Sequence, residues 1–400
     1  MKPLLLFLSF IGVLNACKPI ELSTSETPVL EQDVPHKTYQ PTGNVCLTSD
    51  GGFATVLLRQ AFNQAVSLYN GISYITRNEV VVVKTDQLGQ VQWSKLVGTG
   101  GSTPLIHPLS DGGYLVFQLI PPFLTQNTYQ LLVSHLNSTG EVLTKQAVDG
   151  VNLGLYFTIQ KILSLADKGF IISAHLGNES YFLMRFDEQG KLLWSRSYTQ
   201  ATNTLPGAYR LAATSDGGLM ISWSGYNSAQ PGGYESFLLK TDANGQQIWL
   251  RKYGLFTDNL TVSESTDKGY VLVGRNTSST ATAVLYKLDK DGNIQWSKLY
   301  PLRSTYAGTP IRIFASTDGY EFVFYAYPNS TEIVTTDLAG VEQIHQTRSE
   351  PVISSESGDI LRLSDDSFVY MGLDAYGTIA LTKTKPDKTL QWSSPIATNK

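Results

Sequence analysis

The feature that most constrains this chain is a hairpin unit that recurs along it and is clearest in residues 236–253. An apolar run ends at Asp242, a short turn leads to Gly245, and a second run is centred on Trp249. Aspartate accepts backbone N–H bonds within such a turn, and glycine adopts the positive φ that closes it. Related units with the pattern Asp-x-x-Gly-x-x-x-Trp end at Trp93, Trp194 and Trp296. This repetition predicts one two-stranded building block that is used many times.

A second landmark alternates with the first and consists of an Asp-Gly type of turn followed by an apolar run. Its seven copies begin at Asp50, Asp111, Asp167, Asp216, Asp267, Asp318 and Asp365. Neighbouring copies are 47–61 residues apart. Weaker copies of the Trp unit lie at Asn137/Gly140, at Asp337/Gly340 with Ile344 in place of Trp, and before Trp392. Each landmark therefore occurs seven times, once in every repeat.

Each repeat contains four runs of strand length, and helical periodicity is absent. In the fourth repeat the runs are residues 209–214, 219–224, 237–241 and 247–252. Four antiparallel strands at a period of about 50 residues are typical of a β-propeller blade. We therefore predict an all-β fold, a seven-bladed β-propeller of four-stranded antiparallel blades in residues 44–400. The recurring Trp side chains are expected to pack between neighbouring blades.

The Asp-x-x-Gly-x-x-x-Trp copies resemble the Trp-docking repeat of the quinoprotein-like (PQQ-like) propellers. Combined with the Asp-Gly-Gly turns, they are also similar to repeats of secreted bacterial propeller lipoproteins, most of them of unknown function. Quinoprotein dehydrogenases typically have eight blades and a vicinal Cys pair near the cofactor. This chain has seven repeats and no such pair, so the resemblance implies a blade structure, and we expect no cofactor.

The first 17 residues are expected to be a targeting segment and not part of the fold. Lys2 precedes an apolar run, residues 4–14, that is too short to cross a membrane as a helix. The run is followed by Asn15, Ala16 and Cys17. This ending resembles a bacterial lipobox, in which the Cys is lipidated and becomes the mature N-terminus. The alternative is an ordinary secretory signal with a nearby Cys.

Residues 18–43 are rich in Pro, Ser, Thr and Glu and are expected to form a flexible tether. Charged residues make up only 16% of the chain, below the roughly 25% of a typical soluble protein. The net charge of −4 offers no basic field, so nucleic acid is an unsuitable partner. Cys46 has no second mature Cys to pair with and is expected to be a buried structural thiol.

Tight and long connections alternate along the repeats. Because the turns of a meander alternate between the two faces of a propeller, all tight turns are expected on one face and all long connections on the other. The long connections, beginning with residues 59–79, are poor in charge and rich in Asn, Ser, Thr, Gln, Gly and Tyr. This composition suits carbohydrate or protein recognition, although secreted loops in general share it. The candidate binding-face aromatics are Tyr69, Tyr74, Phe123, Tyr129, Tyr156, Tyr209, Tyr226, Tyr234, Phe256, Tyr306, Tyr327 and Tyr376.

Signatures of catalysis and of metal binding are absent from the sequence. The five His residues are isolated, so none is predicted to be a metal ligand. Residues 289–293 superficially resemble a calcium loop, but they lack its ligand run and are predicted to be a plain turn. Lys84, Arg185, Lys240 and Lys287 each precede an Asp by two residues and are predicted to form exposed ion pairs of little energetic weight. No catalytic residue is proposed from the sequence.

The sequence therefore favours a lipid-anchored propeller of the bacterial cell envelope that acts as a non-enzymatic binding or scaffold module. Lys18 follows the lipobox Cys where Asp often signals inner-membrane retention, which favours the outer membrane. The expected partners are the membrane, through the lipid, and a protein or carbohydrate ligand, and the domain is expected to be monomeric. Two alternatives stay open: an envelope protein-assembly lipoprotein, and a glycan-acting lyase or hydrolase whose residues come from several blades.

Overall fold

The structure is a computed structural model, and all the residues that it describes lie within the unit His36–Lys400. The described ranges are 38–68, 71–99, 102–120, 129–149, 157–176, 180–199, 205–206, 210–226, 234–254, 260–275, 282–303, 309–326, 330–348, 352–353, 360–373 and 378–398. The predicted signal segment and the lipobox Cys17 lie outside the described residues.

Within these ranges every regular element is a β-strand. The strands are β1 (Thr38–Leu47), β2 (Phe53–Leu68), β3 (Gly71–Thr85), β4 (Val91–Thr99), β5 (Ser102–Pro108), β6 (Tyr114–Ile120), β7 (Gln130–Leu136), β8 (Val142–Ala147), β9 (Phe157–Ser164), β10 (Phe170–Leu176), β11 (Ser180–Phe186), β12 (Leu192–Thr199), β13 (Leu205–Pro206), β14 (Arg210–Ala213), β15 (Leu219–Tyr226), β16 (Tyr234–Thr241), β17 (Gln247–Tyr253), β18 (Thr261–Glu264), β19 (Tyr270–Arg275), β20 (Thr282–Leu288), β21 (Ile294–Pro301), β22 (Thr309–Ala315), β23 (Gly319–Ala326), β24 (Ser330–Asp337), β25 (Glu342–Arg348), β26 (Val352–Ile353), β27 (Ile360–Arg362), β28 (Phe368–Leu373), β29 (Thr378–Thr384) and β30 (Leu390–Thr398).

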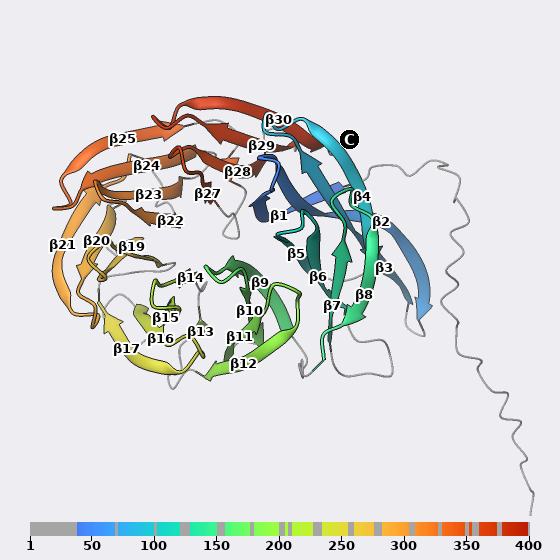
Figure 1. Cartoon of the computed structure of the whole chain (residues 1–400), viewed down its shortest axis with the longest axis horizontal. Coiled ribbons are helices and arrows are strands. Elements are labelled where there is room, and N and C mark those ends of the chain that lie inside the picture. The colour runs from blue at the N-terminus through green and yellow to red at the C-terminus, as the bar shows by residue number, and fades with distance from the viewer. Residues whose placement is uncertain are drawn as a thin grey trace, which may run out of the picture. The chain divides into compact units, whose positions relative to one another are not determined.

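The strands form seven antiparallel sheets arranged in a ring, which confirms the predicted seven-bladed β-propeller (Figure 1). Each blade consists of strands that are consecutive in the chain, from β1–β4 in blade 1 to β26–β30 in blade 7. In blades 4 and 7 the first strand is interrupted, so that two short pieces pair with the second strand. The first strands lie nearest the centre of the ring and the fourth strands form its outer edge (Figure 1).

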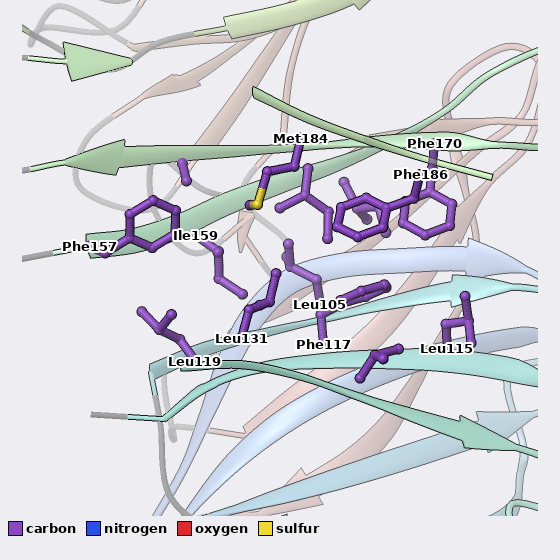
Figure 2. Close-up of a cluster of buried hydrophobic side chains, with 14 of the residues drawn as sticks. Leu105, Leu115, Phe117, Leu119, Leu131, Phe157, Ile159, Phe170, Met184 and Phe186 are labelled. Atoms are coloured by element: carbon purple, nitrogen blue, oxygen red, sulfur yellow. The ribbon is translucent and has the colours of Figure 1, made fainter. Parts of the chain in front are cut away.

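The core lies between the blades, because each sheet is covered on both faces by its neighbours. Between blades 2 and 3, Phe117 of β6 packs on Phe170 of β10 with ring centroids 5.4 Å apart. Phe170 in turn stacks on Phe186 of β11 at 5.2 Å (Figure 2). Met184 and Ile159 belong to the same buried cluster. Each buried side chain of this size stabilises the fold by about 1.5–3 kcal/mol.

All five Trp side chains of the recurring unit dock on the next blade, as the sequence predicts. The six-membered ring of Trp249 in blade 4 lies against Gly292 in the turn of blade 5 that precedes its fourth strand. A Cβ atom at Gly292 would lie 2.9 Å from the ring, so only glycine lets the two blades approach this closely. The same contact pairs Trp93 with Gly140, Trp194 with Gly245, Trp296 with Gly340 and Trp392 with Gly89.

The contact between Trp392 and Gly89 joins the last blade to the first. Phe53 of β2 also lies 6.0 Å from the Trp392 ring, and Gln90 donates to Ser394 at 3.3 Å. The described strands of blades 1 and 7 show no exchange between the two sheets. The ring is therefore closed by side-chain packing between complete blades.

The predicted exposed ion pairs are wrong for all four cations. Lys84, Arg185, Lys240 and Lys287 are buried, at 3–6% exposure, on the third strands of their blades. Each reaches the Asp of its own blade's Asp-Gly type of turn and not the Asp two residues along the chain. The error arises because the strand ends between the two residues. The cation is still in the strand and points into the blade, whereas the Asp two residues later belongs to the turn and no longer follows the alternation of the strand.

The blade 4 copy shows how this cation is held. Lys240 Nζ lies 2.8 Å from Asp216 and donates to the Thr241 carbonyl at 2.7 Å. A Cβ atom at Gly218 would lie 2.5 Å from this Nζ and 2.1 Å from the Thr241 oxygen. The second glycine of the Asp-Gly-Gly turn is therefore required by the buried cation beneath it. We call this arrangement the cation–turn clamp.

We predict that Gly218→Ala destabilises the domain by about 2–4 kcal/mol, because the added methyl group displaces the Lys240 ammonium from its partners. Gly254→Ala is the matched control, since a Cβ atom there would have nothing within 4 Å. Urea unfolding measures both changes. Equal stability of the two variants would contradict the clamp.

The clamp also predicts a loss of stability in acid. Partial burial raises the pKa of Asp216, but hydrogen bonds from Lys240 and Thr214 outweigh this and lower the pKa to about 2. The pKa of Asp267 is lowered to about 2 in the same way. An unfolded Asp titrates near ~3.9, so these carboxylates stabilise the fold above about pH 4 and lose this contribution as pH falls towards 2. Urea unfolding of Asp216→Asn should show a shallower dependence on pH from 4 to 2 than the parent chain.

Candidate binding face

The two faces of the propeller differ in their connections, as the sequence predicts for the described turns. Fourteen tight turns join the first strand to the second and the third to the fourth in each blade. Because the strands are antiparallel and consecutive, both turns of a blade lie at the same end of its sheet. We call this end the turn face. The opposite end, where the connections vary from two residues between β4 and β5 to nine between β8 and β9, is the loop face.

Contacts between blades confirm that neighbouring turns share one face. The Ser110 N–H donates to Glu188 at 3.2 Å, which joins turns of blades 2 and 3. Lys268 Nζ donates to Ser215 at 2.8 Å, which joins turns of blades 5 and 4. The turns themselves are held by their own side chains, as where Asp289 accepts from the Asn293 N–H at 2.8 Å. Residues 289–293 thus form the plain turn that the sequence predicts.

The first long connection, residues 59–79, is a β-hairpin and not a loop. Strands β2 and β3 continue to pair from Arg59↔Glu79 to Leu68↔Gly71, with one register shift at Ala61/Asn63. Arg59 and Glu79 also form an ion pair at the base of this extension. Over a short window the mixture of polar and apolar residues in a hairpin looks like that of a polar loop. This is why the sequence predicts a loop where the structure has a hairpin. Strand β1 likewise begins at Thr38, inside the segment predicted as a tether, because β2 extends far enough to pair with it.

Few of the predicted binding-face aromatics can be placed. Tyr129 is half-buried and packs on the core cluster between blades 2 and 3. Tyr74, Tyr226 and Tyr234 lie in the loop-face portions of β3, β15 and β16, and only their backbone is described. The remaining candidates lie outside the described residues: Tyr69, Phe123, Tyr156, Tyr209, Phe256, Tyr306, Tyr327 and Tyr376. The aromatic surface stays a prediction at these positions.

Trp223 is an aromatic residue near the loop face that the sequence reasoning missed. It lies on β15, stacks on Phe237 with ring centroids 5.3 Å apart, and belongs to the cluster between blades 3 and 4. The sequence signal that could have found it is its position, since it is the Trp that falls outside the Asp-x-x-Gly-x-x-x-Trp series. At 7% exposure its ring is part of the core and not a platform for a ligand.

Buried charges near the loop face are paired within the chain. Glu235 binds Lys252, and Glu332 accepts from the Arg303 N–H and lies 3.0 Å from His345 Nε2. Both carboxylates are thus engaged by partners from the chain itself. Among the described residues no group of three or more His, Cys, Asp or Glu side chains could hold a metal ion.

Two further buried groups, His107 and Cys46, carry atoms that could react. His107 Nδ1 lies 3.3 Å from Ser164 Oγ, but burial lowers the pKa of His107 to about 4, which makes its imidazole a weak base at neutral pH. Cys46 is buried, as predicted, and its thiol donates to the Ala54 carbonyl at 3.5 Å. Burial raises its pKa to about 12, so the reactive thiolate is suppressed. Within the part of the chain that the structure describes, no helix is long and apolar enough to span a membrane.

Comparison with known proteins bears on the fold. No protein-family model and no curated protein sequence matches the chain. Among solved structures it is similar to a PL25 ulvan lyase, a polysaccharide lyase, with a TM-score of 0.54 and 8% identity over 91% of this chain and 98% of that one. It is similar to a putative 6-phosphogluconolactonase from Bacteroides fragilis, with a TM-score of 0.50 and 10% identity over 88% and 97% of the chains. A six-bladed propeller lectin from Aleuria aurantia reaches a TM-score of 0.46 at 8% identity over 74% and 95%.

We predict that Trp223→Ala destabilises the domain by about 3–5 kcal/mol, because it opens a cavity between blades 3 and 4. Leu250→Ala is the control, since Leu250 is 42% exposed on the outer strand β17 and should change stability by less than about 0.5 kcal/mol. Thermal and urea unfolding measure both. A neutral Trp223→Ala variant would instead place this ring on the surface, where it could stack on a ligand.

Proposed function

We propose that this chain is a non-enzymatic binding module that takes a carbohydrate ligand on its loop face. The observation that carries the proposal is the division between the two faces. The turn face consists of uniform tight turns fixed by hydrogen bonds and by the cation–turn clamps. Variation in length and composition is therefore confined to the loop face, where a rigid scaffold can present different side chains to a ligand.

The chemistry of the connecting segments favours a sugar ligand. Residues 200–204, 227–233 and 276–281 contain no charged side chain and consist mainly of Asn, Gln, Ser, Thr, Ala and Gly. Such amide and hydroxyl groups, next to the predicted tyrosines, suit the hydroxyl groups and apolar ring faces of sugars. The ulvan lyase with which the chain shares its fold is described as bound to a glucuronate-containing saccharide, so this architecture can hold a saccharide in that protein.

A lyase or hydrolase is the weaker proposal. Three carboxylates near the loop face are engaged by Lys252, Arg59 and His345. A binding module requires no free catalytic carboxylate, which makes it the stronger proposal. An envelope protein-assembly role would require a protein ligand on the same face, and the binding test below separates that case.

We further propose that Cys17 carries a lipid that anchors the propeller to the cell envelope, at the outer membrane. The lipobox-like ending of the apolar run supports this proposal. Labelling of growing cells with a palmitate analogue should mark the parent chain and not the Cys17→Ser variant. Equal labelling of both would remove the anchor.

The binding proposal is tested with the chain carrying Cys17→Ser, which keeps the whole mature sequence without lipid. A glycan array and a pull-down of envelope proteins are run in parallel. We expect saturable glycan binding with dissociation constants of roughly 1 μM–1 mM. Retention of a protein with no glycan bound would favour the assembly role, and shortening of a bound glycan would favour the enzyme.

Matched variants then locate the site. Tyr209→Ala combined with Tyr327→Ala removes two predicted loop-face rings and should weaken glycan binding at least ~10-fold. Leu338→Ala on the turn face is the control, because Leu338 is 45% exposed in a tight turn and should leave binding unchanged. The reverse result would move the binding site to the turn face.

A further inference from the structure

Blades 1 and 2 enclose a cluster of polar side chains that have no hydrogen-bond partner among the described residues. Gln118 of β6 is 1% exposed, and within the described part of the chain neither its amide oxygen nor its amide nitrogen has a hydrogen-bond partner. Ser134 of β7 is fully buried, and its hydroxyl is likewise unpartnered. An unpaired buried polar group costs about 1–3 kcal/mol, so such groups call for an explanation.

Lys145 of β8 brings a positive charge to the same cluster. It faces Ser134 across the β7–β8 pair, and Ser134 in turn faces Val116, two residues before Gln118. Partial burial lowers the pKa of Lys145, and no carboxylate opposes this effect. Lys145 forms no ion pair among the described residues, and the neighbouring segments 61–77, 100–101 and 121–128 contain no Asp or Glu. Asp149, just beyond the end of β8, is the acidic residue of the connection that follows Lys145's own strand.

Gly98 of β4 forms the opposite wall. A Cβ atom there would lie 2.6 and 2.7 Å from the two polar atoms of the Gln118 amide and 2.7 Å from Lys145 Nζ. The amide and the ammonium therefore converge on the backbone of blade 1, and glycine leaves them room. Gln118 itself is shielded from solvent, whereas Lys145 is exposed at the outer edge of the ring. The cluster is thus approached from the Lys145 side.

Blade 6 supplies an internal comparison for this cluster. His345 occupies the position of Lys145 in that blade, because His345 faces Val334 as Lys145 faces Ser134. Two residues before Val334 lies Glu332, which binds His345 at 3.0 Å. The corresponding residue in blade 2 is Leu132. In blade 6, His345 is therefore paired with a carboxylate of the protein itself. In blade 2, Lys145 lies near an amide and a hydroxyl instead, and its strand position has no matching carboxylate.

We propose that Lys145, Gln118 and Ser134 form a subsite for the carboxylate of an acidic sugar, such as a uronic acid. The ammonium supplies the charge, and the amide N–H and the hydroxyl supply two further donors to the carboxylate oxygens. The subsite lies towards the loop-face ends of β4, β6 and β8, beside the extended β2–β3 hairpin. This inference rests on the proposed carbohydrate function and names the class of sugar.

The subsite is tested on the Cys17→Ser chain with its lysines converted to ¹³C-dimethyl-lysine, which retains their charge. The Lys145 signal is assigned by its loss in Lys145→Gln. Sodium glucuronate up to about 50 mM should shift it in a saturable manner. Glucose and sodium chloride should not, and acetate should bind at least ~5-fold more weakly. No saturable shift, equal binding of acetate, or a parallel shift of the exposed turn-face Lys290 would overturn the proposal.

Two variants separate a subsite from a merely structural cluster. Gln118→Glu places a carboxylate beside Lys145, as Glu332 does beside His345, and should abolish the glucuronate shift while raising the thermal midpoint. Gly98→Ala fills the space between the two blades and should abolish the shift with Lys145 intact. An unchanged glucuronate response in a folded Gln118→Glu chain would contradict the site. Binding of neutral glycans on the array is a separate readout, so loss of the Lys145 response alone removes this inference and leaves the proposed function standing.

Discussion

The structure depends on the contact between a Trp ring on one blade and a glycine in the next blade's turn. A four-stranded blade has two apolar faces and cannot bury either alone, so the fold forms only when neighbours stack. The Trp–Gly contact sets the distance between blades at their outer edge, and Tyr hydroxyls reinforce it. Tyr253, for example, donates to the Gly292 carbonyl at 2.6 Å. Because Trp392 repeats this contact on Gly89, the ring closes by the same packing that builds it.

The junction of blades 6 and 7 shows what happens where this contact is lost. Ile344 replaces the Trp, and the next turn has Lys388 in place of glycine, with a φ of 68°. Lys388 Nζ lies 4.1 Å from the centroid of the Phe368 ring and 3.2 Å from Glu321. Burial raises the pKa of Glu321 despite the attraction of Lys388. At this junction an ionic contact between the two blades stands where the others have a Trp–Gly contact.

The blade count, the antiparallel order and the gathering of the tight turns on one face could be predicted from the sequence, because each repeat carries its own turn residues. The lengths of the other connections could not: the one expected to be long at residues 97–104 is reduced to residues 100–101 between β4 and β5. The cation–turn clamp could not be predicted either. Lys240 lies two residues before Asp242 in the sequence. Its actual partner, Asp216, lies 24 residues before Lys240 and is brought near only by strand pairing. The grouping of Gln118, Ser134 and Lys145 could not be predicted for the same reason. Three ordinary residues on three strands become a cluster only when blade 1 presents Gly98 to them.

In the proposed division of roles, the turn face maintains the structure and the loop face binds the ligand. Hydrogen–deuterium exchange of the lipid-free chain, with and without the glycan that it binds best on the array, tests this most directly. We predict slower exchange with ligand in peptides of the loop face, such as 59–79 and 200–209, and unchanged exchange in the turns at 242–246 and 289–293. Slower exchange confined to those turns would contradict it.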